Sequence, residues 1–278
     1  MYEQFMYQEL ESAKRSAVRA GAILLEHQAS PSVGREGKDD RTVEARQSVR
    51  EFLIKELQGS FPEDAVLSEG DFDRGNFRSK SRAWMVDPLD GASEYDHGHD
   101  EFAVMIGLSV GGTANLGVIY QPRTEKMYYA LLGTGAFLIE NRATRLLRVP
   151  HESDPLAMTM VHNRMHRSAD SAVLQRELGF RNSIVHGGIG LNVGLICEGH
   201  AHLYVHSVRH SYLWETCAPE VVLHEAGGRM TNRFNGPLRY DTVVRNPGPV
   251  IASNGVIHDR IVDTAQALLP PHPDRRNP

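Results

Sequence analysis

Six short segments rich in apolar residues lie close together in the first half of the chain, and they limit the possible folds more than any other feature. Glycine, asparagine, proline and threonine separate them, as is typical of strands joined by turns. Strands this closely spaced along the chain favour antiparallel pairing. We therefore predict an antiparallel sheet with strands at 65–68, 83–86, 102–110, 114–120, 126–132 and 136–139.

Helical patterns lie on both sides of this strand-forming region. Before it, apolar residues at three- and four-residue spacing predict one helix that ends near His27 and a second that Gly59 and Pro62 close, with a polar loop over 30–40 between them. After Pro150 the pattern alternates, as is typical of an α/β arrangement. We expect helices at 168–178, 190–199 and 215–226 and a strand at 202–206.

These patterns predict an α/β fold with two lobes and a tail. The first lobe, over residues 1–150, is α+β with an antiparallel sheet, and a smaller α/β lobe covers 151–268. The Pro-rich segment 269–278 is expected to be disordered, because its composition offers little apolar surface to bury.

Composition excludes several classes of protein. No apolar run approaches the length of a membrane span, and the start of the chain lacks the basic and apolar regions of a signal peptide. The net charge of -5 argues against a surface for nucleic-acid polymers. Cys197 and Cys217 form no C-x-x-C pair, so neither a disulfide framework nor a thiolate zinc site is indicated. We expect a cytoplasmic protein that works without a membrane or a nucleic acid.

The stretch Asp87-Pro88-Leu89-Asp90-Gly91 is the first candidate site, because it directly follows the predicted strand 83–86. Two carboxylates three residues apart, where a strand ends and a helix begins, can converge on one hard cation, and the Leu89 carbonyl could add an oxygen ligand. Backbone N–H groups after Gly91 would then face a phosphate. A surface turn rich in Asp, Pro and Gly is an equally good interpretation of this stretch alone.

Two further acids follow or open predicted elements. Glu69 comes directly after the strand 65–68, and Glu215 opens the helix that Gly227 and Gly228 end. Each also has a simpler interpretation. Glu69 could be a solvated strand end, and Glu215 could be a capping acid.

The order of these motifs resembles that of the inositol monophosphatase superfamily. S-E is followed by W-x-x-D-P-L-D-G and then by W-E-x-x-A-P-E with E-A-G-G. The pattern is especially similar to the branch that dephosphorylates 3′-phosphoadenosine 5′-phosphate and related nucleotides, and the likeness runs from about Lys38 to Val262. It implies an α+β sandwich with αβαβα layers.

The same resemblance implies a role for each matching residue. Magnesium ions, with manganese or zinc as alternatives, would polarise a substrate phosphate and activate a water that attacks it. Glu69 and Asp90 would be catalytic, and Arg46 could act with them. The implied metal ligands are Glu69, Asp87, Leu89, Asp90 and Glu215, and the implied substrate contacts are Gly91, Ala92, Ser93, Gly187, Gly188 and His206.

Several positions depart from the family pattern. Thr42-Val43-Glu44-Ala45-Arg46 replaces V-T-x-A-D, so a cation stands where a metal-binding Asp is usual. Arg46 could neutralise phosphate in place of an ion, or it could turn outward while Glu44 or Asp40 substitutes. Ala92 replaces a Thr that helps orient water, and Glu215 replaces an Asp. The stretch 187–192 lacks the Lys with which the nucleotide branch recognises a second phosphate.

A group of histidines also falls on the expected substrate side. Individually, each is more easily explained as a solvated or hydrogen-bonded side chain. Together they could bind an anionic substrate, act as general acids or hold a softer metal. They are His97, His99, His186, His202, His206 and His210.

Taken together, these features predict a magnesium-dependent phosphatase, acting as a homodimer on a phosphomonoester of a small polar metabolite such as an inositol, sugar or nucleotide phosphate. The alternative is a relative that performs non-hydrolytic chemistry on a phosphorylated metabolite or only binds it. A scaffold without a cation is disfavoured, because converging carboxylates would repel one another.

Overall fold

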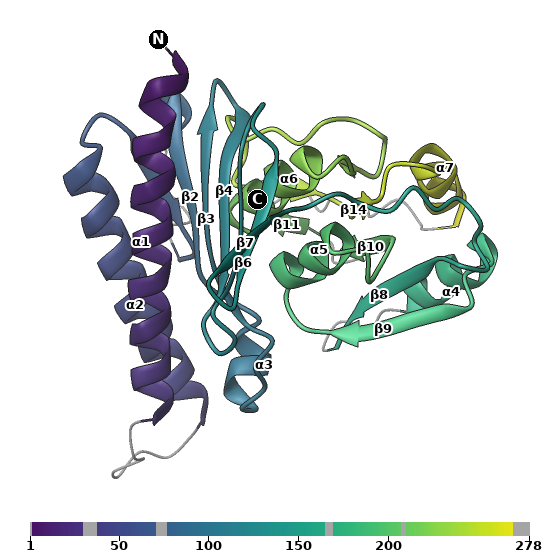
Figure 1. Ribbon diagram of the computed structural model, residues 1–278, viewed down its shortest axis with the longest axis horizontal. Coiled ribbons are helices and arrows are strands. Elements are labelled where there is room, and N and C mark those ends of the chain that lie inside the picture. The colour runs from purple at the N-terminus through teal and green to yellow at the C-terminus, as the bar shows by residue number, and fades with distance from the viewer. Residues whose placement is uncertain (1, 30–37, 71–76, 165–168, 207–209, 269–278) are drawn as a thin grey trace, which may run out of the picture.

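Helices and sheets alternate in five layers in the computed structural model, which describes residues 2–29, 38–70, 77–164, 169–206 and 210–268 (Figure 1). Helices α1 (Tyr2–Ala29) and α2 (Lys38–Ser60) cover the outer face of the first sheet. Helices α5 (Ile189–Cys197) and α6 (Leu213–Glu225) lie between the two sheets, and α4 (Ala169–Leu178) and α7 (His258–Leu268) cover the far side of the second. The predicted αβαβα order is confirmed.

The first sheet has seven strands in chain order. Strands β1 and β2 pair in parallel and all later neighbours pair antiparallel, so the antiparallel prediction holds for all but the first pair. The seventh strand was not predicted, because its four residues are all exposed and carry no apolar alternation. The strands are β1 (Ala65–Ser68), β2 (Arg82–Asp90), β3 (Ala103–Val110), β4 (Thr113–Gln121), β5 (Lys126–Leu131), β6 (Ala136–Glu140) and β7 (Ala143–Leu146).

Strand β2 is longer than predicted, and this changes the setting of the Asp-Pro-Leu-Asp stretch. We expected the strand to end at Val86 and the motif to form a turn. Instead β2 continues to Asp90, and its register against β3 shifts between Asp87 and Asp90. Pro88 lies within this irregularity, where a residue without an N–H group is tolerated in a sheet. The shift places both carboxylates on one strand near the helices that follow.

The second sheet has five strands in the order β12-β14-β10-β8-β9. Of these strands, β10 (Leu203–His206) was predicted. The other four have four or five residues each and no regular alternation of polar and apolar side chains, so no sequence pattern marked them. Strands β11 (His210–Tyr212) and β13 (Arg245–Pro247) form a separate pair, and α7 was also not predicted. The other strands are β8 (Thr159–Asn163), β9 (Asn182–His186), β12 (Arg229–Asn232) and β14 (Val250–Ser253).

Several predicted boundaries need correction. The polar loop was drawn to Asp40, but α2 already begins at Lys38. Helix α6 begins at Leu213, two residues before the predicted start at Glu215. The helices α3 (Ala92–Asp96) and η1 (Phe77–Ser79) are short elements beside the first sheet. The tail 269–278 falls outside the described residues.

The interior is shared by the two halves of the chain. The largest group of buried apolar side chains includes Met85 and Ile119 from the first sheet, Trp214 from α6 and Ala252 from the second sheet. The division near residue 150 stays a prediction. Across the described ranges, no helix combines the length and apolar character needed to cross a membrane.

Helix α6 packs against the first sheet through two glycines. A Cβ added at Gly117 would lie 2.6 Å from Cγ1 of Val221 and closer still to the Ala218 carbonyl oxygen. A Cβ at Gly107 would lie 2.7 Å from Sγ of Cys217. These separations are shorter than van der Waals contact, so the helix can approach this closely only because both strand residues lack a side chain.

We predict that Gly117→Ala lowers the free energy of unfolding by at least about 2 kcal/mol, because the added methyl group would push α6 away from β4. Chemical denaturation measures the change. Gly59→Ala is the matched control, since nothing lies within 4 Å of a Cβ there. In the helix α2 this control should be neutral or stabilising by up to about 1 kcal/mol. Equal effects of the two substitutions would refute the close-packing explanation.

Candidate metal and substrate site

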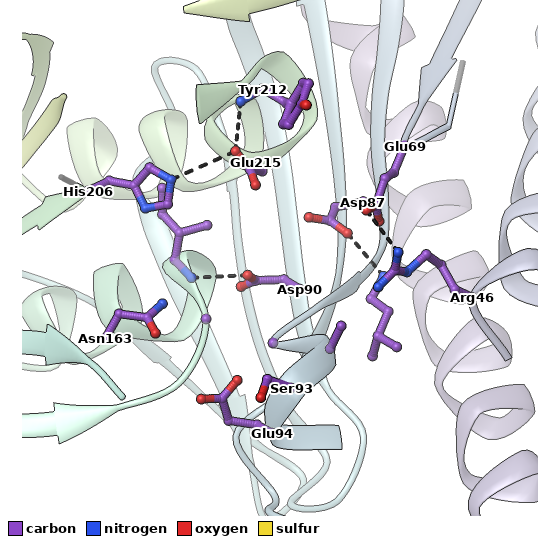
Figure 2. A pocket seen from close by; sticks show the side chains of 15 residues that line it. Arg46, Glu69, Asp87, Asp90, Ser93, Glu94, Asn163, His206, Tyr212 and Glu215 are labelled. Carbon is purple, nitrogen blue, oxygen red and sulfur yellow. Dashed lines mark hydrogen bonds and ion pairs between the residues drawn. The ribbon is translucent and has the colours of Figure 1, made fainter. Parts of the chain in front are cut away.

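A pocket of about 360 Å³ lies where α2, β2, α3, α5 and α6 meet (Figure 2). Every predicted site residue except Gly187 lines it, so the fold brings together positions that are far apart in the chain. The predicted residues that line it are Arg46, Glu69, Asp87, Leu89, Asp90, Gly91, Ala92, Ser93, Gly188, His206 and Glu215.

The two aspartates of β2 are buried and held by backbone N–H groups. The Leu89 N–H donates to Oδ1 of Asp87 at 3.0 Å. The N–H groups of Ile189 and Gly190 donate to the two oxygens of Asp90, at 3.1 and 2.8 Å. Asp90 therefore faces the pocket and also ties β2 to the N-terminus of α5, where N–H groups lack intrahelical partners.

Glu215 lies in the first turn of α6, on the other side of the pocket. The Tyr212 N–H donates to its Oε2 at 2.7 Å, which is the backbone half of a capping box. Nε2 of His206 lies 3.9 Å from the same oxygen. Glu215 thus caps the helix, which was the simpler of its two interpretations. Its carboxylate also lines the pocket.

Arg46 points into the pocket and binds a predicted metal ligand. Its guanidinium donates to Oε1 of Glu69 at 3.1 Å, and both side chains are about one-third exposed (30%/30%) (Figure 2). Of the two orientations considered for Arg46, the structure therefore has the inward one. The side chain of Asp40 lies outside the described part of the chain.

Burial disfavours the charged forms of the four carboxylates, and repulsion by neighbouring acids adds to this effect for Asp87, Asp90 and Glu215. Burial raises the pKa of Asp87 well above its ordinary value, and the charges of Glu69, Asp90 and Glu215 raise it further. Burial also raises the pKa of Asp90 to about 6 and the pKa of Glu215 to about 8, against backbone N–H groups that lower both. The pKa of Glu69 is raised by burial and lowered by Arg46. A cation among these groups would favour their ionised forms.

The donor atoms suit a hard divalent cation. Carboxylate and carbonyl oxygens are the ligands that Mg²⁺ prefers. Within the described ranges, no three His, Cys, Asp or Glu side chains converge closely enough to hold an ion by themselves. Mg²⁺ needs no such cage, because it usually keeps several waters and binds through one or two carboxylates plus a substrate phosphate. The residues therefore fit magnesium better than zinc, whose structural sites are closed by Cys and His.

The predicted substrate contacts lie at the other end of the pocket. Gly91 precedes α3 with a φ of 80°, a left-handed conformation that suits glycine, and Ala92 and Ser93 form the first turn. Gly188 precedes α5 and faces Asp90, whereas Gly187 packs against Glu94. Their roles as substrate contacts stay predictions.

The histidine side chains that the structure describes do not form the group that was considered, and the side chain of His210 lies outside the described part of the chain. Among the side chains that the structure describes, His206 is the member that lines the pocket. His202 accepts the Thr159 N–H through Nδ1, His97 lies 2.8 Å from the Ser93 carbonyl oxygen, and Nδ1 of His186 lies 3.1 Å from the Gly187 carbonyl oxygen. Each of these three has a local backbone partner, so they are explained as individual hydrogen-bonded side chains.

Four residues of the pocket were not predicted from the sequence. Asn163 ends β8 and Tyr212 precedes α6, and neither belongs to a motif that carries charge. Ile189 contributes its N–H group, which no sequence pattern reveals. Glu94 had a signal, since it lies four residues after Asp90 and is an acid in a helix that begins at the site.

Comparison with known proteins places this geometry in a family. The model of the inositol monophosphatase family matches residues 6–269. The chain belongs to the inositol monophosphatase family. The resemblance seen in the sequence motifs is thereby confirmed, and the relatives of this family are phosphatases that act on phosphorylated small metabolites.

Curated relatives in this family carry different names. An inositol-1-monophosphatase of Bacillus subtilis is 26% identical over 259 residues, with 91% of this chain and 94% of that protein covered. A histidinol-phosphatase of Mycobacterium tuberculosis is 26% identical over 257 residues, covering 90% of this chain and 92% of the relative. The human 3′(2′),5′-bisphosphate nucleotidase 1 is 32% identical over 172 residues, covering 58% of this chain and 53% of its own.

Solved structures of this family show the same fold. An inositol monophosphatase from Anabaena has a TM-score of 0.76 and 24% identity, with 96% of this chain and 98% of that chain covered. CysQ from Bacteroides thetaiotaomicron, a bacterial member of the family, has a TM-score of 0.76 and 23% identity, with 89% of this chain and 97% of that chain covered.

We predict that Asp87→Asn raises the free energy of unfolding by about 1 kcal/mol at pH 8 in the presence of a chelator, because it removes one of several repelling buried charges. The amide oxygen can still accept the Leu89 N–H. Added magnesium should then raise the melting temperature of the original protein more than that of the variant.

Asp64→Asn is the matched control for this substitution. Asp64 is also a buried carboxylate beside β2, but Arg82 lies 2.8 Å from it and Trp84 donates to it at 3.0 Å. Its substitution should destabilise the protein by about 1 to 3 kcal/mol, because Trp84 and Arg82 would lose a charged hydrogen-bond partner and Arg82 would be left with Glu9. If Asp87→Asn destabilised the protein as much, repulsion within the cluster would be ruled out.

Proposed function

We propose that this chain is a magnesium-dependent phosphatase that hydrolyses a phosphomonoester of a small polar metabolite. The observation that carries the proposal is the convergence of Glu69, Asp87, Asp90 and Glu215 on one pocket, where each is buried enough that its pKa is raised. Family membership supports the reaction class. The proposal includes a homodimer that works in the cytoplasm, as expected from the sequence.

Magnesium would be held by the carboxylates of Glu69, Asp87, Asp90 and Glu215 and by the Leu89 carbonyl, with each ion bound through one or two of these groups together with waters and the substrate phosphate. When bound, it supplies charge neutralisation for the phosphate and lowers the pKa of water for hydrolysis. The protein's own contribution is to hold the carboxylates in place. Backbone N–H groups orient Asp87, Asp90 and Glu215, so three of the four acids keep their positions without help from other side chains.

The substrate phosphate would lie between the first turn of α3 and Arg46. The first N–H groups of a helix have no intrahelical partners, so those of Ala92 and Ser93 can donate to phosphate oxygens. Arg46 has five N–H donors and uses one on Glu69, which leaves others for the phosphate. Positioning and charge neutralisation of this kind account for most of the protein's part in phosphoryl transfer.

Two features favour the alternative, in which a phosphorylated metabolite binds but reacts without hydrolysis. The guanidinium of Arg46 occupies one oxygen of Glu69, an acid that would otherwise help to orient water. Ala92 lines the pocket without a hydroxyl group. Both changes weaken water activation while leaving phosphate binding intact.

We predict that the purified protein releases inorganic phosphate from at least one member of a panel of inositol, sugar, nucleotide and amino-alcohol phosphates when magnesium is present, and that a chelator abolishes release. Asp87→Asn should lower kcat/KM at least about a hundredfold, because a charge of the cation site is removed. Asp87 is a cleaner test than Asp90, whose two oxygens both anchor α5.

A stable Asp87→Asn variant with full activity would contradict the site assignment. Substrate that binds in the presence of magnesium, with no phosphate released from any ester, would support the non-hydrolytic alternative.

We predict that Arg46→Asp increases the number of bound magnesium ions per chain and changes the dependence of activity on magnesium concentration. The substitution removes a cation 3.1 Å from Glu69 and adds a carboxylate beside it. Isothermal titration calorimetry counts the ions. Lys55→Asp is the control, because it makes the same change of charge at an exposed position of the same helix. Identical titrations for the two variants would show that Arg46 does not take the place of an ion.

A further inference from the structure

Glu94 is a buried carboxylate in the pocket that no part of the proposed reaction uses. It lies on α3, is 3% exposed and lines the pocket. Its Oε1 is buried without a hydrogen-bond partner. Figure 2 shows the carboxylate pointing into the pocket next to Ser93, on the side of Asp90 away from Glu69 and Arg46.

The backbone around Glu94 holds the side chain in this position. A Cβ at Gly187 would lie 2.7 Å from Cδ of Glu94, and a Cβ at Gly188 would lie 2.6 Å from Oδ2 of Asp90. The two glycines are consecutive, and consecutive Cα atoms are about 3.8 Å apart. Glu94 and Asp90 therefore lie side by side against the same short piece of chain.

Two arginines in this part of the molecule already have carboxylate partners of their own. Arg46 binds Glu69, and Arg164 forms an ion pair with Glu101. In the part of the chain that the structure describes, no side chain forms an ion pair with Glu94. An ionised carboxylate without a partner is costly in a buried place, so a ligand that supplies positive charge there gains a large share of its affinity from that contact.

We propose that Glu94 binds a protonated amino group of the substrate, so that the site takes a short aminoalkyl phosphate. This inference rests on the proposed function, since the phosphate end of such a molecule would lie at the carboxylate cluster and its cation. A hydroxyl group could donate a hydrogen bond to Glu94, but it would leave the carboxylate charge uncompensated. The pocket would then bind the positively charged amine at Glu94 and the negatively charged phosphate at the metal cation.

Two substrates of nearly equal size separate charge from shape. 2-Aminoethyl phosphate and 2-hydroxyethyl phosphate differ only in the group that would face Glu94. We expect kcat/KM for the amine to exceed that for the alcohol by about tenfold or more, the factor that corresponds to a hydrogen bond with a charged group. In Glu94→Gln, which keeps the shape and removes the charge, the ratio should fall to about one.

Asp96→Asn is the matched control. It removes one carboxylate from the same short helix, but Asp96 accepts a hydrogen bond from Thr42 at 3.1 Å and does not line the pocket. This variant should keep the preference for the amine. Without substrate, Glu94→Gln should melt at the same temperature as the original protein or higher, because an unpaired buried charge is lost. A marked decrease would indicate a structural role and would overturn the proposal.

The outcomes distinguish this inference from the proposed function. Phosphate release with no preference between the two substrates, or a preference unchanged by Glu94→Gln, refutes the role of Glu94 while the phosphatase stands. If no ester is hydrolysed, the proposed reaction fails, and the shift of melting temperature by each compound with magnesium replaces kcat/KM as the readout. A larger shift with the amine, lost in Glu94→Gln, then supports the amine subsite, and equal shifts refute it.

Discussion

The close contact between helix α6 and the first sheet is the constraint on which the rest of the structure depends. Gly107 and Gly117 leave room for the helix backbone, so α6 can lie between the two sheets and be buried on nearly all sides. The N-terminus of the same helix carries Glu215 to within reach of the strand that carries Asp87 and Asp90. Without that contact the acids of the two halves of the chain would not meet, and neither the shared interior nor the pocket would exist.

The site is assembled mainly by the main chain. Three of its four acids accept hydrogen bonds from backbone N–H groups, so the side chains of the donor residues play no part in these contacts. The donors are Leu89 for Asp87, Ile189 and Gly190 for Asp90, and Tyr212 for Glu215. Such bonds hold carboxylates in place while they repel one another, which is a condition for concentrating negative charge before a cation arrives. The exception is Glu69, whose partner is the side chain of Arg46.

The sequence predicts well wherever a pattern is strong. Six strands of the first sheet and the helices α1, α2, α4, α5 and α6 follow from apolar spacing and turn residues, and the acids of the site follow from motifs at element ends. Strand β7 and most of the second sheet could not be predicted, because short strands without alternation look like loops. Asn163 and the N–H groups of α5 reach the pocket only through the folded arrangement, so no local signal marks them.

The cap on α6 has a consequence for how this site could have changed during evolution. Compared with an Asp at this position, the longer side chain of Glu215 reaches back to the Tyr212 N–H at 2.7 Å while its carboxylate still borders the pocket. A Glu at the third helical position can make this reach, and a side chain one methylene shorter is less suited to it. Exchange between the two acids therefore alters helix-end stability and ligand geometry together. A substitution at position 215 cannot change the helix cap without also changing the position of the carboxylate in the pocket, and this limits the substitutions that the position tolerates.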